Sequence, residues 1–190
     1  MKLLEDRILK DGKVYPGDIL KIDSFLNHQI DVKLMEEIAK EIKRLFPDVK
    51  PTKILTIESS GIAIASEVSK QYDYVPVVFA KKQKASNMAE AYCATEKSYT
   101  RNLNYDVSVA KEYIKENDQI LIVDDFLANG EALNAMIKIC NQAKAKVLGA
   151  AVVVCKAYQP GLKRIEDMGI HVECLAKVKS LENNKIEFEQ

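Results

Sequence analysis

The sequence has no tryptophan and little glycine, proline or histidine: its 190 residues include 7 Gly, 5 Pro and 2 His. Such low glycine and proline contents exclude a collagen-like or low-complexity chain. An excess of charge of one sign is also missing, because 28 Lys and Arg balance 28 Asp and Glu. A protein that binds nucleic acid non-specifically carries a basic excess, so the composition argues against nucleic acid as a partner.

Long apolar runs are missing as well. The longest, at 147–155, is too short to cross a bilayer, which takes about 20 apolar residues in a helix. The first ten residues are rich in charge and lack the apolar centre of a signal peptide. We therefore expect a cytoplasmic protein with no membrane partner.

The cysteines are few and scattered. Cys93, Cys140, Cys155 and Cys174 form no C-x-x-C pair, and only two histidines are available to join them. This spacing indicates neither a zinc site nor a disulfide framework. We expect four reduced, mostly buried thiols.

What the chain does have is an alternation of short apolar runs with amphipathic segments, which is typical of a parallel sheet covered on both faces. The helix expected at 31–46 is the clearest, with Asp31 as its N-cap and Pro47 as its terminator. We predict an α/β fold, a Rossmann-like open sheet flanked by helices, in one domain over 1–190. The expected strands are 53–57, 75–80, 119–123, 147–155 and 171–178. Three further helices are expected: one from the turn at 58–61 to about 72, one that includes 133–140, and one near 161–168.

Ligands of such sheets bind beyond the carboxyl ends of the strands, so the residues after each apolar run matter most. In VDDFLANGEAL, at 123–133, Asp124 and Asp125 end a strand and a loop leads through Gly130 into a helix. The N–H groups at that helix start can hold a phosphate, and the carboxylates can accept hydroxyl hydrogens. This combination suits a phosphorylated ribose. The alternative is that the two aspartates only end the strand and start a turn.

TIESSG, at 56–61, is a second turn between a strand and a helix. Ser59, Ser60 and Gly61 offer hydroxyl and N–H groups for another anion, although Ser60 alone would also serve as an N-cap. The segment is not the G-x-S-x-G turn of hydrolases. Neither loop matches a Walker A or G-x-G-x-x-G motif, which weakens nucleoside triphosphates and dinucleotides as ligands.

Lysines follow two of the apolar runs. Lys81, Lys82 and Lys84 lie beside the two anion loops and suit a pyrophosphate, unless they form an ordinary solvated turn. The polar stretch from Lys81 to about 100 is long enough for an active-site lid or a surface hairpin. Lys156, after the 147–155 run, can donate to a purine oxygen, and Asn27 offers donors and an acceptor to a base edge.

Four segments together resemble the type I phosphoribosyltransferases, and most closely their xanthine-specific branch. They are KIDSFLNHQ at 21–29, TIESSG at 56–61, VDDFLANG at 123–130 and KAYQPG at 156–161, and the resemblance extends over essentially the whole chain. One departure is the loop ANGEA, at 128–132, where many type I members carry hydroxyl residues in a T-G-G-T pattern. Phosphate binding must then depend on backbone N–H groups.

The resemblance implies a homodimeric enzyme that transfers a phosphoribosyl group from phosphoribosyl diphosphate to xanthine. Mg²⁺ would arrive with the substrate, and no protein group is assigned as a metal ligand. A small hood from about 1–30 and the C-terminal segment would cover the base.

The resemblance also assigns residues to each part of the site. Asp124 and Asp125 would be catalytic, beside the ribose hydroxyls. The 5-phosphate would be held by Ala128, Asn129, Gly130, Glu131 and Ala132. The diphosphate would be held by Glu58, Ser59, Ser60, Gly61 and Lys81, with an unusual peptide between Ser59 and Ser60 and with Lys81 coming from either subunit. The base would contact Leu20, Asn27 and Lys156.

Three alternatives stay open at this point. Guanine and hypoxanthine share the 6-oxo group that Lys156 would contact, and Asn27 could serve xanthine or guanine by turning its amide. A regulator that binds phosphoribosyl diphosphate without catalysis would need a nucleic-acid surface, which the balanced charge disfavours. A phosphorylation-receiver domain is disfavoured by the late position of the acidic pair.

Overall fold

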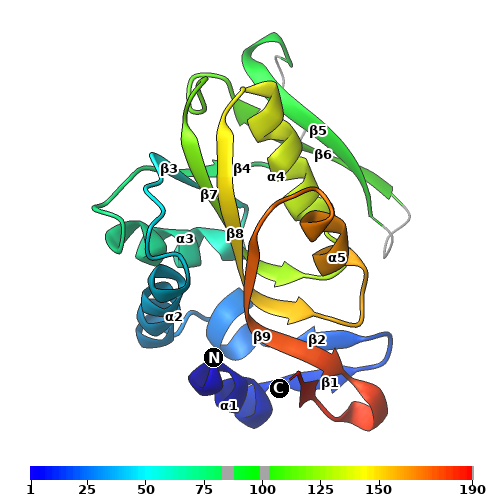
Figure 1. The fold of residues 1–190 in the computed structure, drawn as a ribbon. Helices are drawn as coiled ribbons and strands as arrows, with labels where there is room; N and C mark the ends of the chain where they lie inside the picture. The colour runs from blue at the N-terminus through cyan, green and yellow to red at the C-terminus, as the bar shows by residue number, and fades with distance from the viewer. Residues whose placement is uncertain (83–87, 99–102, 190) are drawn as a thin grey trace.

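The computed structural model describes residues 1–82, 88–98 and 103–189, and at its centre lies a six-stranded sheet of order β10–β9–β8–β7–β3–β4 (Figure 1). Five neighbouring strands run parallel, and only β10 is antiparallel to its neighbour β9. The carboxyl ends of the parallel strands therefore share one edge, and the predicted α/β class is confirmed. The strands are β3 (Lys53–Ile57), β4 (Val77–Ala80), β7 (Gln119–Leu127), β8 (Lys146–Lys156), β9 (Val172–Ser180) and β10 (Glu187–Phe188).

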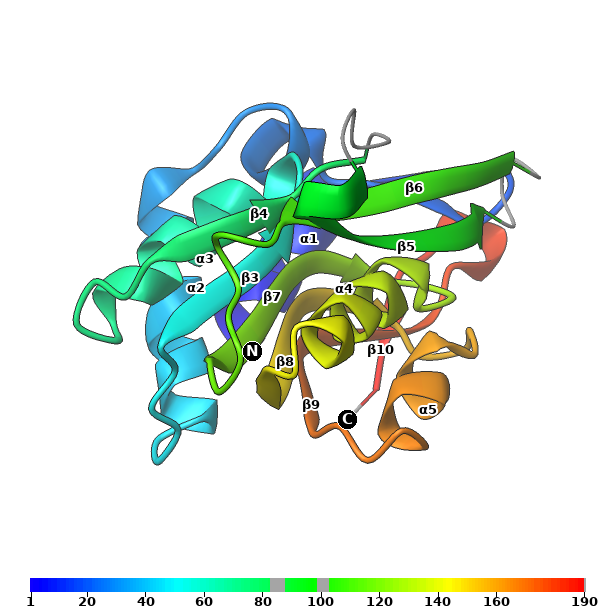
Figure 2. The ribbon, with the colours of Figure 1, turned by 90° about the horizontal axis from the view of Figure 1, so that it is seen from above.

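Helices cover both faces of this sheet (Figures 1 and 2). α2 (Val32–Leu45) and α3 (Ser60–Lys70) lie on one face, and α4 (Glu131–Gln142) and α5 (Gly161–Glu166) lie on the other. The side chain of Asp31 accepts a hydrogen bond from the Leu34 N–H at 3.1 Å, which confirms the predicted N-cap of α2.

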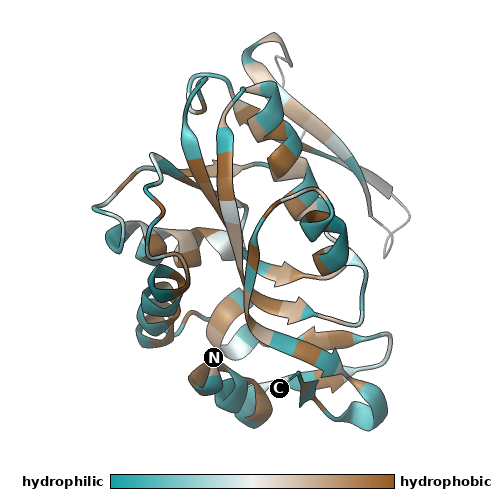
Figure 3. Ribbon diagram, viewed as in Figure 1, coloured by the Kyte–Doolittle hydropathy of each residue, from teal (hydrophilic) through white to brown (hydrophobic). Residues whose placement is uncertain are grey.

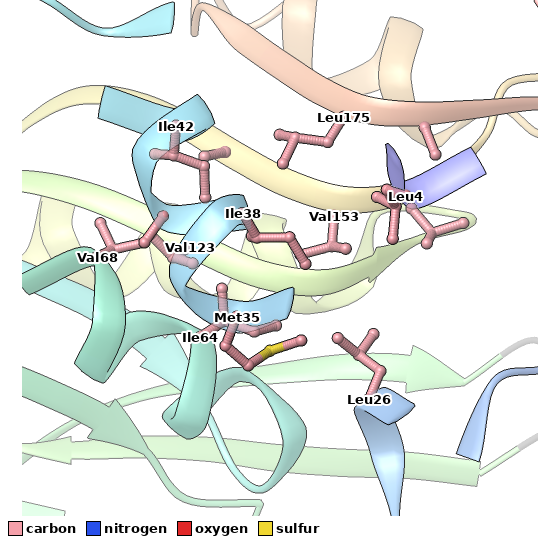
Figure 4. Packing of buried hydrophobic residues seen from close by; sticks show 14 of the residues in the cluster. Leu4, Leu26, Met35, Ile38, Ile42, Ile64, Val68, Val123, Val153 and Leu175 are labelled. Atoms are coloured by element: carbon pink, nitrogen blue, oxygen red, sulfur yellow. The ribbon is translucent and has the colours of Figure 1, made fainter. Parts of the chain in front are cut away.

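The central strands β3, β7 and β8 are largely apolar on both faces, which fits a sheet whose two faces are covered (Figure 3). On β7, Val123 packs against the core that α2 and α3 share, whereas its neighbour Ile122 packs against the core under α4. Figure 4 shows Val68 of α3 beside Val123, and Ile38 of α2 beside Val153 of β8. Packing on both faces holds the sheet in place, and with it the strand ends that carry the candidate site residues.

The polar stretch after Lys81 forms a hairpin over its described part. β5 (Ala91–Ser98) follows a 3₁₀ turn (Met88–Glu90) and pairs antiparallel with β6 (Leu103–Ala110), and the hairpin packs on α4. Of the two predicted alternatives, lid or hairpin, the described residues follow the hairpin. Lys84, which belongs to the predicted lysine cluster, lies outside the described residues.

The two ends of the chain lie together at the lower end of β9 in Figure 1. α1 (Lys2–Asp11) precedes a small hairpin of β1 (Lys13–Tyr15) and β2 (Ile19–Lys21), which leads into a π-helical turn, η1 (Asp23–Asn27). Near the other end, a 3₁₀ turn (Glu182–Asn184) leads to β10. The Met1 ammonium donates to the Leu175 carbonyl of β9. In the part of the chain that is described, no helix has the length and apolar character needed to cross a membrane.

Candidate functional site

A cavity of about 490 Å³ opens at the carboxyl edge of the sheet. Its wall combines the end of β3 and the start of α3, one lysine after β4, and the end of β7 with the first turn of α4. The lining residues are Ile57, Glu58, Ser59, Ser60, Lys82, Asp124, Asp125, Phe126 and Ala132. The turn at 58–61 and the segment from Asp124 to Ala132, the two predicted anion sites, therefore line the same cavity.

The first wall is the turn between β3 and α3. A side chain at residue 61 would overlap the Thr56 hydroxyl oxygen, so only glycine lets α3 start this close to Thr56 of β3. The non-proline cis peptide in this turn joins Glu58 and Ser59, one bond before the position expected from the resemblance. Glu58 Oε1 accepts a hydrogen bond from the Lys82 N–H at 2.6 Å and links this turn to the end of β4.

The acidic pair lies within β7 and not after it, which corrects the prediction that the strand ends at residue 123. Asp124 is buried, with 2% of its surface exposed, whereas Asp125 is half-buried in the cavity wall. Burial raises the pKa of Asp124 well above its usual range, and the neighbouring Asp125 carboxylate adds to the rise while Lys82 opposes it. One carboxyl group of the pair therefore tends to keep its proton.

Two polar groups surround this pair. The Asn27 amide donates a hydrogen bond to Asp125 Oδ2. Beneath Gly61, the Thr56 hydroxyl is buried and has no hydrogen-bond partner within the described residues. Oxygen atoms thus gather at this end of β7, although no group of three or more His, Cys, Asp or Glu suited to a metal ion occurs in residues 1–82, 88–98 and 103–189.

The second wall is the loop from β7 into α4. Gly130 is the N-cap of α4 with a φ of 87°, a left-handed conformation that glycine adopts without strain. The N–H groups in the first turn of a helix have no partner within the helix, and the helix dipole makes that end attractive to anions. Ala132 lines the cavity, and residues 128–131 lead directly up to it.

This loop is supported from behind by the start of α5. The Gly161 N–H donates to the Ala128 carbonyl at 3.0 Å. A side chain at residue 161 would overlap that same oxygen and come within 2.8 Å of the Gly130 nitrogen. The glycine therefore allows α5 to lie against the loop and to fix its shape.

The three residues assigned to the base lie beside the cavity and are not part of its lining. Asn27, in η1, reaches the cavity through Asp125. Leu20 is buried on β2, and Lys156, the last residue of β8, donates to the Asp18 carbonyl of the same hairpin at 2.5 Å. Burial lowers the pKa of Lys156. The structure thus brings residues 20, 27 and 156 to the side of the site where the chain ends lie.

The lysine in the cavity wall is Lys82, and Lys81 is not part of that wall within the described chain. Lys81 pairs through its backbone with Ser108 of β6, at 2.9 and 3.0 Å, and its side chain is exposed. Lys82 belonged to the lysine cluster in the sequence, but its neighbour was the one assigned. Ile57 and Phe126 were also missed, although both follow directly from the rule that strand ends line the site.

The family model described as "Phosphoribosyl transferase domain" matches residues 21–181. The chain belongs to the phosphoribosyltransferase family. A xanthine phosphoribosyltransferase of Clostridium novyi (strain NT) is 53% identical over 189 residues, which cover 99% of either chain. The xanthine phosphoribosyltransferase of Lactobacillus johnsonii is 49% identical, over 99% of this chain and 98% of the relative.

Solved structures show the same family fold. The adenine phosphoribosyltransferase of Rhodothermus marinus matches with a TM-score of 0.73 at 20% identity, covering 92% of this chain and 98% of that one. The Giardia lamblia adenine enzyme matches with a TM-score of 0.75 at 20% identity, over 90% and 96% of the two chains. At this identity the likeness concerns the fold alone, and it confirms the predicted type I phosphoribosyltransferase architecture.

Proposed function

We propose that this phosphoribosyltransferase transfers the 5-phosphoribosyl group of phosphoribosyl diphosphate to xanthine, which gives xanthosine monophosphate and diphosphate and serves purine salvage. The observation that carries the reaction is the single cavity that joins the acidic pair, the α4 N-terminus and the turn at 58–61. The choice of base is supported by the full-length relatives at about half identity, whose names specify xanthine.

The phosphorylated ribose would lie along the second wall. The N–H groups of residues 128–132 would bind the 5-phosphate, since ANGEA has no hydroxyl side chain to help. Asp124 and Asp125 would contact the ribose hydroxyls. Because burial raises the pKa of Asp124, its carboxyl group can donate to one hydroxyl, while the Asp125 oxygens accept from another.

The diphosphate would lie along the first wall, against Glu58, Ser59, Ser60 and Gly61. Lys82 of the same chain lines this space, and Lys81 would reach a diphosphate from its own or the partner subunit. Mg²⁺ bound to the substrate would neutralise charge on the departing diphosphate. The Asp125 carboxylate, in the cavity wall, is a hard oxygen donor that fits such an ion, directly or through water.

Xanthine would bind between Leu20, Asn27 and Lys156, with the Lys156 ammonium donating to the 6-oxo group. Asn27 contacts Asp125, so the base and the ribose meet at this point. The bond between the anomeric carbon and the diphosphate oxygen breaks, and the diphosphate keeps the electron pair. A nitrogen lone pair of the base then forms the new bond to the anomeric carbon, and the base loses its proton to solvent.

We further propose that residues 1–190 act as one domain, in which about 1–30 and the C-terminal segment form a hood over the base. The α1 helix, the β1–β2 hairpin and β10 supply such a cover beside residues 20, 27 and 156. The homodimer is carried over from the family resemblance, and the cytoplasmic location from the composition of the sequence.

The test is to measure kcat/KM for xanthine, guanine, hypoxanthine and adenine with phosphoribosyl diphosphate and Mg²⁺. We expect a strong preference for xanthine. A preference for guanine or hypoxanthine would keep the chemistry and overturn the base assignment. Binding of phosphoribosyl diphosphate without turnover of any purine would overturn the enzymatic function and favour a regulator.

A further inference from the structure

Outside the cavity, a cluster of charged and polar side chains joins the three elements that surround the loop at 128–130. Glu96 of β5 is buried, with 6% of its surface exposed. Its Oε1 accepts hydrogen bonds from Asn134 Nδ2 and Lys138 Nζ of α4, both at 2.7 Å. Its Oε2 lies 3.9 Å from Arg164 Nη2 of α5.

A buried carboxylate costs free energy unless its oxygens are paired, so its presence calls for a reason beyond filling space. Other contacts between the hairpin and the core around α4 include apolar ones, as for Ala94 and Val107, and hydrogen bonds between Gln142 and the backbone of Cys93. Unlike an apolar contact, the carboxylate is directional: one oxygen accepts two hydrogen bonds from α4, and the other lies within ion-pair distance of Arg164 of α5.

Both helices near Glu96 also contact the loop at 128–130, which is the proposed phosphate loop. The Asn134 N–H donates to the Gly130 carbonyl at 2.9 Å, so the Glu96 partner lies one turn from the loop. Arg164 follows Gly161 within the same short helix, and the Gly161 N–H donates to Ala128. The contacts of Glu96 therefore lead to both ends of the loop.

We propose that Glu96 is a positioning residue, which fixes α4 against α5 and thereby holds the N–H groups of residues 128–132 in the geometry that binds a phosphate. Glu96 itself does not line the cavity. The inference rests on the proposed function in one respect, namely that the phosphate belongs to a phosphorylated ribose. It extends that function because a residue of the β5–β6 hairpin, outside the cavity, would affect the affinity for phosphate.

The chain offers a matched control on the same helix and the same strand. At the far end of α4, Gln142 Nε2 donates to the Cys93 carbonyl at 2.7 Å and Gln142 Oε1 accepts from the Cys93 N–H at 3.2 Å. With a rise of about 1.5 Å per residue, this contact lies roughly 16 Å along the helix from the loop. Gln142→Ala therefore weakens the hairpin–helix contact without disturbing the loop.

The experiment compares Glu96→Gln and Gln142→Ala with the unmodified full-length protein. Calorimetry gives the Kd of ribose 5-phosphate, kinetics give KM for phosphoribosyl diphosphate and for xanthine, and melting curves give Tm. Loss of a charge-assisted hydrogen bond predicts a rise of about tenfold in both phosphate-dependent constants for Glu96→Gln, with KM for xanthine within about twofold. Gln142→Ala is expected to lower Tm and leave all three constants unchanged.

Lys138→Met is a milder second variant, because Lys138 is 48% exposed and only one donor is lost. We expect a rise of about threefold in the ribose 5-phosphate Kd, since exposed pairs contribute less. Equal effects of Glu96→Gln and Gln142→Ala on the phosphate constants would overturn the positioning role. Tighter phosphate binding by Glu96→Gln would also overturn it, because the carboxylate would then act by repulsion.

The readouts separate this inference from the proposed function. If the unmodified protein binds ribose 5-phosphate but converts no purine, the proposed function fails, and the calorimetric comparison still decides the role of Glu96. If the unmodified protein does not bind ribose 5-phosphate, the positioning role fails as well.

Discussion

The phosphate side and the base side of the site are built in different ways. The phosphate side is one continuous strand, loop and helix, fixed by the sheet and by the close approach of Gly161. The base side brings together Leu20, Asn27 and Lys156 from a small hairpin, a π-helical turn and the end of β8. The proposed anion-binding groups thus lie on the core of the fold, whereas the proposed base-binding groups lie on short elements held by a few side-chain contacts.

The largest effect is expected where the two sides meet, at Asp125. Asp125→Ala removes the carboxylate that accepts from Asn27 and that we propose contacts the ribose hydroxyls, and we expect kcat to fall by about 10³-fold, as for loss of a group that stabilises the transition state. Steady-state kinetics on a variant with an unchanged circular dichroism spectrum gives the measurement. The control is Asp118→Asn, at the residue just before the first residue of β7. Unchanged turnover in folded Asp125→Ala would remove Asp125 from the mechanism.

On the phosphate side, Gly161→Ala pushes the loop away from α5. The new methyl group would overlap the Ala128 carbonyl oxygen, and a displacement of the order of 1 Å costs up to about 10²-fold in such sites. We expect KM for phosphoribosyl diphosphate to rise by one to two orders of magnitude, with KM for xanthine much less affected. Gly169→Ala is the matched control, since residue 169 has a positive φ of 78° but nothing within 4 Å of its Cβ position. An equal rise in that variant would show that the contact with the loop is irrelevant.

On the base side, Lys156→Met keeps the unbranched, apolar part of the side chain and removes the ammonium group. Loss of a hydrogen bond from a charged donor predicts a rise of about tenfold in KM for xanthine, while KM for phosphoribosyl diphosphate stays within about twofold. A rise in KM for phosphoribosyl diphosphate with an unchanged KM for xanthine would place Lys156 on the phosphate side and contradict the division of the site into two regions.

The smallest effect is expected in the scaffold of the base side. Asp31 caps α2 and pairs with Arg7 at 2.7 Å, and Arg7 lies over the Phe25 ring of η1 at 5.0 Å. The Leu34 N–H and then the Arg7 guanidinium lower the pKa of Asp31 below its usual range. A lowered pKa in the folded state stabilises the protein above the unfolded pKa of about 4, and this contribution is lost as the pH falls through the folded value.

Asp31→Ala is therefore expected to lower the free energy of unfolding by about 1 kcal/mol at pH 7, which is typical of a lost N-cap. Urea denaturation of the variant and the unmodified protein at pH 7 and at lower pH gives the difference between them. We expect this difference to shrink as the pH falls. A difference that does not change with pH would mean that the carboxylate charge contributes nothing.

The sequence predicted the regular parts of the molecule well, because their signals are local. β3 covers the predicted 53–57, and α2 begins after the predicted cap at Asp31. The end of β7 could not be read locally: the apolar run stops at Val123, yet pairing continues from Asp124 with Val152 to Leu127 with Cys155. Long-range pairing thus carries the acidic residues into the strand.

The same reason explains what was missed at the site. Lys82 lines the cavity in place of Lys81 because the backbone of Lys81 pairs with Ser108, far along the chain. The β1–β2 hairpin and η1 are too short to show a periodic pattern, and packing against the rest of the molecule determines them. The proposed phosphate loop follows from a motif in the sequence, whereas the proposed base side rests only on a family resemblance.

The contact between residue 161 and the loop also constrains how this protein can change over generations. A larger residue 161 is tolerated only after the loop has moved, and a moved loop leaves a gap where the glycine lies. Neither substitution is neutral alone, so accepted changes at these two places are expected to occur in pairs. A directed-evolution library that seeks a new ligand for this loop should therefore randomise 128–130 and 161 together.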